Sequence, residues 1–558
     1  MTDEFSASYS DLLDGTYDCV DRLVLNAYNP LCASPGGFRT WWRRLMGGSD
    51  ADLDTAHLMR LAGRFSRRVR AYADANGIPV IDCKAGERKH ELAEEYLGEH
   101  PAARGVFLIL VARAVAPVWE VERTPNGTLR NLAKKKAYVN HYSFHIMDPE
   151  WGHLTIKLSG HPPFGAQIIL NGHEYVASRG AKQGLNFTKE GNCFTRVDSP
   201  VELAKVADTV SDARASGHLS QLCDRWIYTA CLCFGLSLEE QERSGFQYAY
   251  SVYQVEYSRN LLFTEGGQME QVFQDLVDRN RARLGLRQIR TIFGTHHRHT
   301  RARTGQRASR VAVTLERPVY SLTVFKLHFG QLTLKGYTKG ERVLRFEAIV
   351  HNTRELGCGR VIAKLPTIVA RLKAILDRAL RTVQWLDRAF VADATLDQLP
   401  VPAQLGKTRV GGIDLGQVRM RTVLAAIVAL ALTPRGVTVG ELAAKIHEIG
   451  GQAVRDYGVR QAAYDLKKLR AKQLVEKPGH SRRYQVLDHG LRTITALVVL
   501  REHVLKPLLA AASQPIASAP LRPKLGRKPK TWSPIDEHYQ TLRLTMHALL
   551  NDLHLAVA

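Results

Sequence analysis

Three carboxylates have the chemistry that a phosphodiester-cleaving site needs. Asp148 and Glu150 lie in the turn of a predicted hairpin, and Glu347 lies on a predicted strand. Hard divalent cations prefer oxygen ligands, and metal-assisted phosphodiester cleavage commonly uses carboxylates gathered on a sheet. Asp148, Glu150 and Glu347 are therefore candidate catalytic residues, with Mg²⁺ or Mn²⁺ as the cofactor if the protein is a nuclease. A structural role stays open, because Asp-Pro is ordinary turn chemistry and exposed carboxylates are common on strands.

The densest positive charge lies between Arg279 and Arg310. This segment contains ten arginines and no lysine, aspartate or glutamate. Guanidinium groups bind phosphates through two hydrogen bonds and stack on bases, so the segment suits RNA or single-stranded DNA. A solvated loop is the structural alternative. The candidate contacts are Arg279, Arg281, Arg283, Arg287, Arg290, Arg298, Arg301, Arg303, Arg307 and Arg310.

Residues 417–511 have the element order of a winged helix. Thr438 and Glu441 form a predicted capping box at the start of the second helix. The predicted elements are helices over Gln417–Leu432, from Thr438, over Val459–Gln473 and from about Gly490, with a hairpin of Leu474–Lys477 and Arg482–Leu487. The order predicts a recognition helix for a DNA major groove and a wing for phosphates. A protein-docking module is the alternative.

The predicted recognition helix has an apolar face and a basic face. Val459, Ala462, Ala463 and Leu466 recur at helical spacing and are expected to be buried. The candidate nucleic-acid contacts are Arg460, Gln461, Tyr464, Lys467 and Lys468 on the helix, and Arg482 and Arg483 on the wing.

Composition favours a polyanionic partner. The chain has 558 residues, with 77 Lys and Arg against 54 Asp and Glu, a formal net charge of +23. Such an excess indicates DNA, structured RNA or both. An anionic membrane surface is the rival, but the most apolar stretch, Val423–Leu432, is too short to cross a bilayer. The acidic N-terminus has no signal-peptide pattern, and the eight scattered cysteines suggest reduced thiols, so we expect a cytoplasmic protein.

The expected fold class is α+β with several domains: a mixed α/β N-terminal half, a central antiparallel sheet with helices, and a C-terminal winged helix. The predicted divisions are a helical region at 1–75, an α/β domain at 76–200, a mixed domain at 201–400, the winged helix at 401–511, and a basic linker with a terminal helix at 512–558. The oligomeric state is not predicted.

Several stretches resemble a widespread, largely uncharacterised family of bacterial and metagenomic proteins. They are Gly77–Cys83 with Lys89-His90, Tyr142–Gly152, Leu170–Tyr175 and the C-terminal winged helix. The likeness covers most of the chain. It implies no catalytic residue, because we know of no established activity for that family.

A weaker resemblance is to rolling-circle replication initiators. Gly336–Gly340 and Leu344–Glu347 look like the Tyr-x-Lys turn and the Leu-Arg-x-Glu strand of that family. In those proteins a tyrosine attacks DNA and a histidine pair holds the metal. The resemblance therefore implies Tyr337 as a nucleophile, although the His-hydrophobic-His motif is missing here.

These observations favour a nucleic-acid-binding protein of bacterial, mobile-element origin. The winged helix is expected to bind duplex DNA, and the Arg279–Arg310 segment to bind RNA or a single strand. The alternatives are a metal-dependent nuclease or nicking initiator, and a winged-helix transcriptional regulator.

Overall fold

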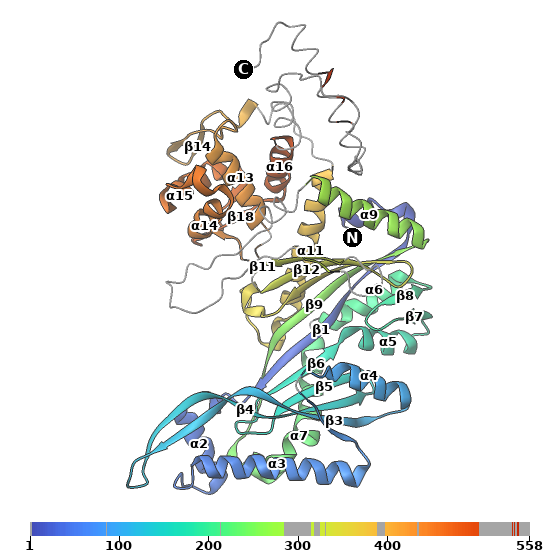
Figure 1. The fold of residues 1–558 in the computed structure, drawn as a ribbon, viewed down its shortest axis with the longest axis vertical. Coiled ribbons are helices and arrows are strands. Elements are labelled where there is room, and N and C mark those ends of the chain that lie inside the picture. The colour runs from blue at the N-terminus through green and yellow to red at the C-terminus, as the bar shows by residue number, and fades with distance from the viewer. Residues whose placement is uncertain are drawn as a thin grey trace, which may run out of the picture. The chain divides into compact units, whose positions relative to one another are not determined.

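The computed structural model describes residues 3–84, 86–212, 214–283, 314–316, 324–329, 331–387, 397–431, 433, 435–501, 538, 541 and 544–545. The chain forms two compact units (Figure 1). The first comprises residues 1–274 and 314–376, and the second comprises residues 275–313 and 377–558. Helices and strands both contribute heavily to the described parts, so the expected α+β class is confirmed.

The first unit is organised around one large sheet. Its described strands number eleven, in the order β10-β11-β12-β13-β9-β1-β6-β5-β4-β3-β2. Every described pairing in this sheet is antiparallel except that of β2 with β3. The bounds are β1 Leu13–Tyr28, β2 Val80–Asp82, β3 Gly105–Arg123, β4 Leu129–Asp148, β5 Gly152–Ser159, β6 Ala166–Asn171, β9 Ala249–Phe263, β10 Thr314–Glu316, β11 Val324–Phe329, β12 Leu332–Lys339 and β13 Val343–Val350. The pair β7 Phe187–Lys189 and β8 Phe194–Val197 forms a separate small sheet.

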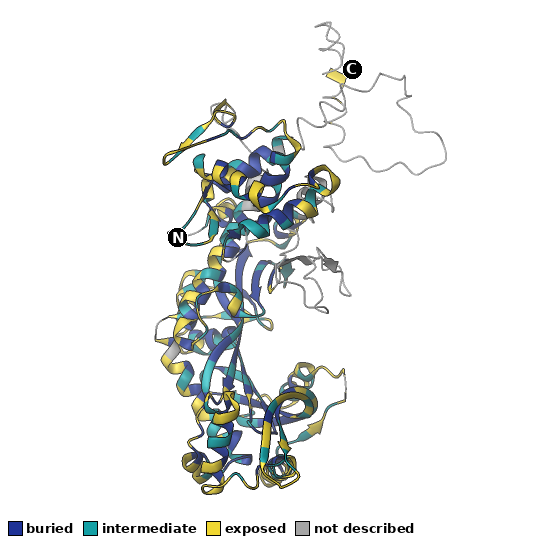
Figure 2. Cartoon of the chain, turned by 90° about the vertical axis from the view of Figure 1, so that its left-hand side faces the viewer, coloured by how far each residue is buried: buried dark blue, intermediate teal, exposed yellow. Residues whose placement is uncertain are grey.

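Helices pack on this sheet and bury its middle strands (Figure 2). In α3, Phe65 is fully buried and its ring centroid lies 4.8 Å from that of Tyr142 on β4. This helix begins at its N-cap Asp54 and ends at Gly77, which has a φ of +65°. The helices are α1 Glu4–Ala7, α2 Pro35–Met46, α3 Thr55–Asn76, α4 Lys89–Glu99, α5 Gly172–Lys182, α6 Pro200–Asp208, α7 Ala215–Ala230, α8 Leu238–Ser244, α9 Gly266–Arg283 and α11 Leu365–Asp387.

Strand β1 corrects two expectations about the N-terminal half. Residues 1–75 were expected to be helical, but β1 lies near the middle of the sheet, between β9 and β6. The divisions at 75/76 and 200/201 are also wrong as domain boundaries. Strands from all three regions share the sheet, so backbone hydrogen bonds and a common core join them.

Strands β3 and β4 extend well beyond their neighbours. Strand β5 pairs with β4 only from His141 to Asp148, whereas β3 and β4 remain paired as far as Arg123 and Leu129. Residues 113–123 and 129–140 therefore form a two-stranded arm, visible at the lower left of Figure 1. Three consecutive lysines, Lys134, Lys135 and Lys136, lie on the second strand of this arm.

The described elements of the second unit include the expected helices and hairpin, and also three short strands, β14, β15 and β16, that were not expected. The elements are β14 Ala403–Leu405, β15 Thr408–Val410, α13 Val418–Leu430, β16 Val437–Thr438, α14 Val439–Gly450, α15 Val459–Ala471, β17 Val475–Glu476, β18 Arg483–Val486 and α16 Asp488–Val499. Strands β16, β18 and β17 form an antiparallel sheet in that order. The capping box of Thr438 and Glu441 is present at the start of α14.

Candidate functional site

A pocket of about 810 Å³ opens in the first unit where the arm joins the rest of the sheet. Its walls come from β1, β3, β4, β5, β6 and β9 and from the segments around residues 30, 162 and 357. Among the described residues, no carboxylate lines it. Its charged side chains and histidines are Lys134, Lys157, Arg354, Arg360, His141 and His161, and its larger aromatic side chains are Tyr28, Trp119 and Tyr253.

The four cations of this pocket stand apart from the acidic side chains of the described chain. None of the ion pairs between described residues involves Lys134, Lys157, Arg354 or Arg360. Burial lowers the pKa of Lys157, and the charge of Lys89 lowers it further. Lys157 and Arg360 are partly buried, whereas Lys134 and Arg354 are exposed. Four positive charges that line one pocket without an acidic partner produce a local potential that attracts an anion.

Backbone pairing holds these side chains in place. Lys157 lies on β5 between its partners Ser143 and Gln167. The amide of Val252 on β9 donates to the Arg360 carbonyl at 2.7 Å, which fixes the segment that carries Arg360. The backbone hydrogen bonds of the sheet therefore fix the positions of these lining residues.

Lys134 is held by two further contacts. Its Nζ donates to the Ala33 carbonyl at 2.6 Å and lies 5.1 Å from the Trp119 ring centroid. Both contacts keep the ammonium group at the pocket wall without neutralising it.

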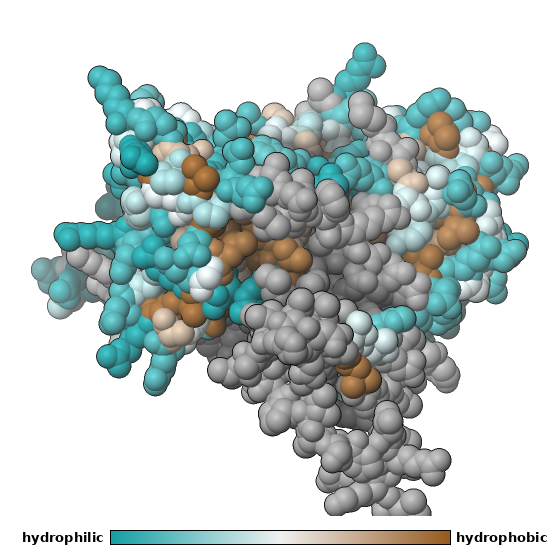
Figure 3. All heavy atoms as spheres, turned by 90° about the horizontal axis from the view of Figure 1, so that it is seen from above, coloured by the Kyte–Doolittle hydropathy of each residue, from teal (hydrophilic) through white to brown (hydrophobic). Residues whose placement is uncertain are grey.

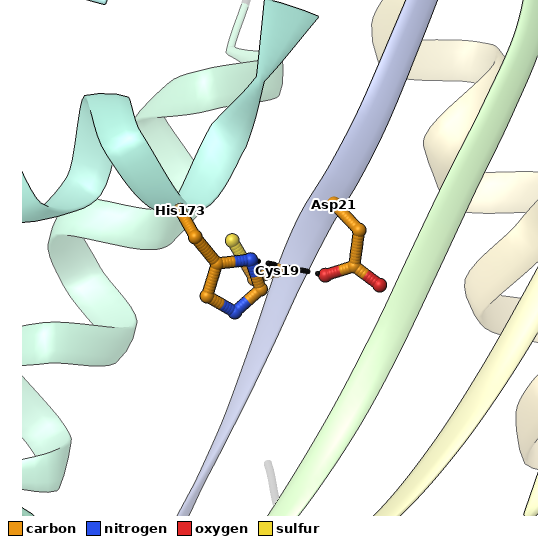
Figure 4. Close-up of side chains that lie close together, drawn as sticks. All are labelled: Cys19, Asp21 and His173. Carbon is orange, nitrogen blue, oxygen red and sulfur yellow. Dashed lines mark ion pairs between the residues drawn. The ribbon is translucent and has the colours of Figure 1, made fainter. Parts of the chain in front are cut away.

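A second cluster is buried near the middle of the sheet, at Cys19 and Asp21 on β1 and His173 on α5 (Figure 4). All three side chains are buried, and one ligand atom from each lies within 4.8 Å of the others. His173 Nδ1 is 3.1 Å from Asp21 Oδ1, and His173 Nε2 has no hydrogen-bond partner among the described residues. Local sequence explains the position of His173, because the Asn171 side chain accepts from its amide and caps α5.

Asp21 is also linked to the candidate residues on β12 and β13. Arg345 is fully buried and lies 2.6 Å from Asp21 Oδ2 and 2.9 Å from Glu347 Oε1. Tyr337 donates its hydroxyl to Glu347 Oε1 at 2.6 Å. Tyr337 and Glu347, both expected from the sequence to be catalytic, therefore meet. Burial raises the pKa of Tyr337, and the Arg345 charge opposes that rise.

The charge and the hydrogen-bonding groups of Asp21 are largely compensated by neighbouring protein side chains. Burial alone would raise the pKa of Asp21, but Arg345, His173 and Ser258 together lower it below its usual value. The Cys, His and Asp donor set suits zinc better than Mg²⁺ or Mn²⁺. However, Asp21 already accepts from Ser258 and Arg345, and the cluster is most simply a charge-compensated polar core.

Asp148 and Glu150 lie elsewhere and make structural contacts. Asp148 is buried, accepts from the amides of Glu150 and Trp151, and accepts from Trp226 Nε1 at 2.9 Å. Glu150 forms an ion pair with Arg179 at 2.8 Å. Strands β4 and β13 are five strand spacings apart, about 24 Å at ~4.8 Å per spacing, so these carboxylates and Glu347 do not share one site.

The predicted recognition helix, α15, has a smaller exposed basic face than expected. Arg460, Gln461 and Lys467 are exposed, but Lys468 is buried, with its Nζ 5.3 Å from the Tyr464 ring centroid. Tyr464 is partly exposed and its hydroxyl accepts from the Gly411 amide. Lys468 is buried because the hairpin of β14 and β15 packs against its side of α15.

Two further predictions for this unit, for Val459 and Arg483, differ from the structure. Val459 was expected in the core but is 55% exposed, because it is the first residue of α15. On β18, Arg483 donates to the Gly436 carbonyl and lies 3.4 Å from Glu441, so it supports the fold. Arg482 is exposed, and its contact with phosphate stays a prediction.

Most of the arginine-rich segment lies outside the described residues. Arg279, Arg281 and Arg283 end helix α9, whose backbone is described there. Arg287, Arg290, Arg298, Arg301, Arg303, Arg307 and Arg310 lie outside the described part, as does most of the 512–558 region.

The pocket was missed at the sequence level. The residues that line it are spread through the sequence from Asn26 to Arg360. No short sequence motif therefore indicates that they lie together. The one available signal is the run Lys134-Lys135-Lys136, which marks the arm as basic.

Comparisons with protein-family models, curated proteins and solved structures find no match. The two family resemblances therefore stay predictions. In the described part of the chain, no helix combines the length and the apolar character that crossing a bilayer requires. Among the residues coloured in Figure 3, most of those at the surface are hydrophilic, and the hydrophobic ones form separate patches.

Proposed function

We propose that this protein binds nucleic acid, and that the pocket at the base of the arm is a principal contact with the phosphodiester chain. The observation that carries the proposal is a large pocket whose described lining includes Lys134, Lys157, Arg354 and Arg360 and no carboxylate. A neutral ligand would leave these four charges uncompensated. A chain of phosphates supplies repeated negative charge over the length that such a pocket offers.

Substitution of two pocket cations tests this proposal. Lys157→Gln with Arg360→Gln removes two positive charges, so binding of a labelled oligonucleotide should weaken. The slope of log K against log salt should become shallower by about one for each phosphate that the variant no longer neutralises. Fluorescence anisotropy across a salt series measures both quantities.

The matched control is Lys205→Gln on α6, where the lysine is exposed and pairs with Glu202. It removes a charge that does not line the pocket and should leave the slope unchanged. An unchanged slope in the pocket variant, or an equal change in the control, would contradict the proposal.

The second unit supports a contact with duplex DNA. Helix α15 exposes Arg460, Gln461 and Lys467, and the hairpin of β17 and β18 exposes Arg482. Three helices with a small antiparallel sheet, in this order, are the parts of a winged helix. In that arrangement α15 is the recognition helix and Arg482 contacts phosphate on the wing.

A second candidate function is cleavage of a phosphodiester by transesterification. It is favoured by the 2.6 Å hydrogen bond from Tyr337 to Glu347, with Lys335 3.3 Å from Glu347 and Arg345 also beside that carboxylate. In this reaction Tyr337 Oη attacks phosphorus and Glu347 takes the hydroxyl proton. The bond between phosphorus and the leaving sugar oxygen breaks, and that oxygen takes a proton from water. The resulting phosphotyrosine is covalent.

A labelled oligonucleotide distinguishes this activity from binding. Incubation with the protein, with and without Mg²⁺ or Mn²⁺, should give a labelled band that survives denaturing electrophoresis. Tyr337→Phe should abolish the band, whereas Tyr138→Phe should retain it. No covalent band under any metal condition removes the enzymatic candidate and leaves the binding proposal intact.

A further inference from the structure

The arm has two chemically different faces. Side chains alternate across a strand, so Lys134, Lys136 and Tyr138 point to one side of β4 and Lys135 points to the other. On β3, the cross-strand partners of the first three are Trp119, Pro117 and Val115. The face that carries Tyr138 is called the tyrosine face below.

The tyrosine face combines an exposed ring with cations. Tyr138 is 66% exposed and Val115, directly opposite, is 50% exposed. Lys136 and Arg113 are exposed on the same side, and none of the described ion pairs involves either residue. An exposed aromatic ring with an apolar neighbour has no structural need to remain in water, so its exposure suggests a ligand with a flat, apolar surface.

The tyrosine face is continuous with the pocket. Val115, Pro117, Trp119 and Lys134 belong to the arm and also line the pocket. A second tyrosine, Tyr28 at the end of β1, lines the pocket and is 45% exposed. Cations for phosphates and rings for bases therefore occur along one connected surface.

We propose that this surface binds an unpaired nucleic-acid strand, with bases stacked on Tyr138 and Tyr28 and phosphates at the pocket cations. This inference rests on the nucleic-acid binding proposed above and specifies its substrate class. Every base has a flat face that stacks on an aromatic ring, but in a duplex these faces are covered by neighbouring base pairs. Stacking on tyrosine therefore selects single strands, whereas cations alone do not.

Binding of three labelled probes by the full chain tests the inference. The probes are a single-stranded DNA of about 20 nucleotides, an RNA of the same sequence, and the corresponding DNA duplex. The double variant Tyr28→Leu, Tyr138→Leu keeps apolar side chains but removes both rings. It should bind single strands roughly tenfold more weakly, because each base stack contributes substantially to affinity. Duplex binding and the salt slope should stay unchanged.

Two controls make the test specific. Tyr28→Phe with Tyr138→Phe keeps the rings and should retain single-strand affinity. Lys136→Gln should weaken binding, whereas Lys135→Gln should not, because Lys135 lies on the opposite face and pairs with Glu120. Circular dichroism and thermal unfolding check that all variants fold.

The outcomes separate this inference from the proposed function. If none of the probes binds, the proposed function fails and the inference fails with it. If the leucine variant keeps full single-strand affinity, or loses duplex affinity as much as single-strand affinity, the inference alone is overturned. Equal weakening with DNA and RNA indicates recognition of the shared base and phosphate chemistry, and weakening with one alone identifies the strand type.

Discussion

Buried charge is concentrated at a few residues of the central sheet. Arg345 is surrounded by Asp21, Glu347, the Asn260 side chain and the Asn192 carbonyl. Burial alone would lower the pKa of this guanidinium, but the adjacent carboxylates and phenols raise it well above its usual value. The cluster thus depends on each charge keeping its partner.

Removal of Arg345 should strongly destabilise the protein. Arg345→Met leaves Asp21 buried without its arginine and leaves Lys335 as the remaining cation beside Glu347. Removing one partner of a buried ion pair costs about 3–5 kcal/mol in comparable cases. Urea unfolding followed by circular dichroism measures the decrease in stability. Adding Asp21→Asn to this variant should recover part of the stability, because it removes one uncompensated charge. A decrease no greater than that of the exposed-pair variant Arg88→Met would contradict the expectation.

Histidine protonation should limit stability in mild acid. Burial, together with His153 and Lys89, lowers the pKa of His145 to about 3, whereas an unfolded histidine titrates near its ordinary value of 6.5. The folded state therefore binds fewer protons, and stability present above pH 6.5 is lost as pH falls toward 3. The contribution from His145 is about 3 kcal/mol by pH 4.

Unfolding measured between pH 8 and pH 4 checks this dependence. His145→Gln cannot be protonated and should flatten the pH profile. The exposed His218→Gln should keep the wild-type slope. Identical slopes for the wild type and His145→Gln would show that this histidine does not control acid stability.

At the scale of elements, sequence patterns predicted the turns and helix caps, because these depend on residues close together in the chain. The hairpin turn at 148–152 and the Thr438 capping box both depend on residues a few positions apart. Strand β1 was missed because Asp18 and Asp21 interrupt its apolar alternation. Their compensating cations, Arg259 and Arg345, are more than 200 residues away in the sequence, and a local pattern does not contain that information.

The candidate site shows the same limit. Tyr337 and Glu347 lie on the neighbouring strands β12 and β13, and both were candidates from the sequence. The pocket instead joins residues on several distant strands. Lys468 was placed on the wrong side of α15 because helical spacing does not reveal the β14–β15 hairpin that packs beside it. Sequence thus identified the basic character of the surfaces better than their shape.

Helix α15 should contribute to duplex binding through few side chains. Arg460→Gln with Lys467→Gln removes the two exposed cations expected to contact phosphate or base edges, so duplex affinity should fall and the salt slope should decrease by about one to two. Anisotropy with a labelled duplex measures this change. Arg492→Gln, an exposed change on α16, is the control. Unchanged duplex affinity would indicate that this unit docks on protein instead.

At the scale of the whole molecule, the net charge of +23 is unevenly distributed. Ten of the 77 lysines and arginines fall in the 32 positions from Arg279 to Arg310, where acids are absent. Changing these ten to glutamine lowers the formal charge to +13, since 23 minus 10 is 13. If the segment contacts phosphates, this change should weaken binding and flatten the salt slope further than the pocket variant does.

A charge-preserving variant separates the contribution of charge from that of guanidinium geometry. With all ten arginines changed to lysine, the salt slope should stay close to that of the wild type, because the number of neutralised phosphates is unchanged. Affinity should still decline, because lysine neither binds phosphate bidentately nor stacks on bases as arginine does. If the glutamine variant keeps both the affinity and the slope of the wild type, the segment is not a binding element, and the pocket and α15 must account for the interaction.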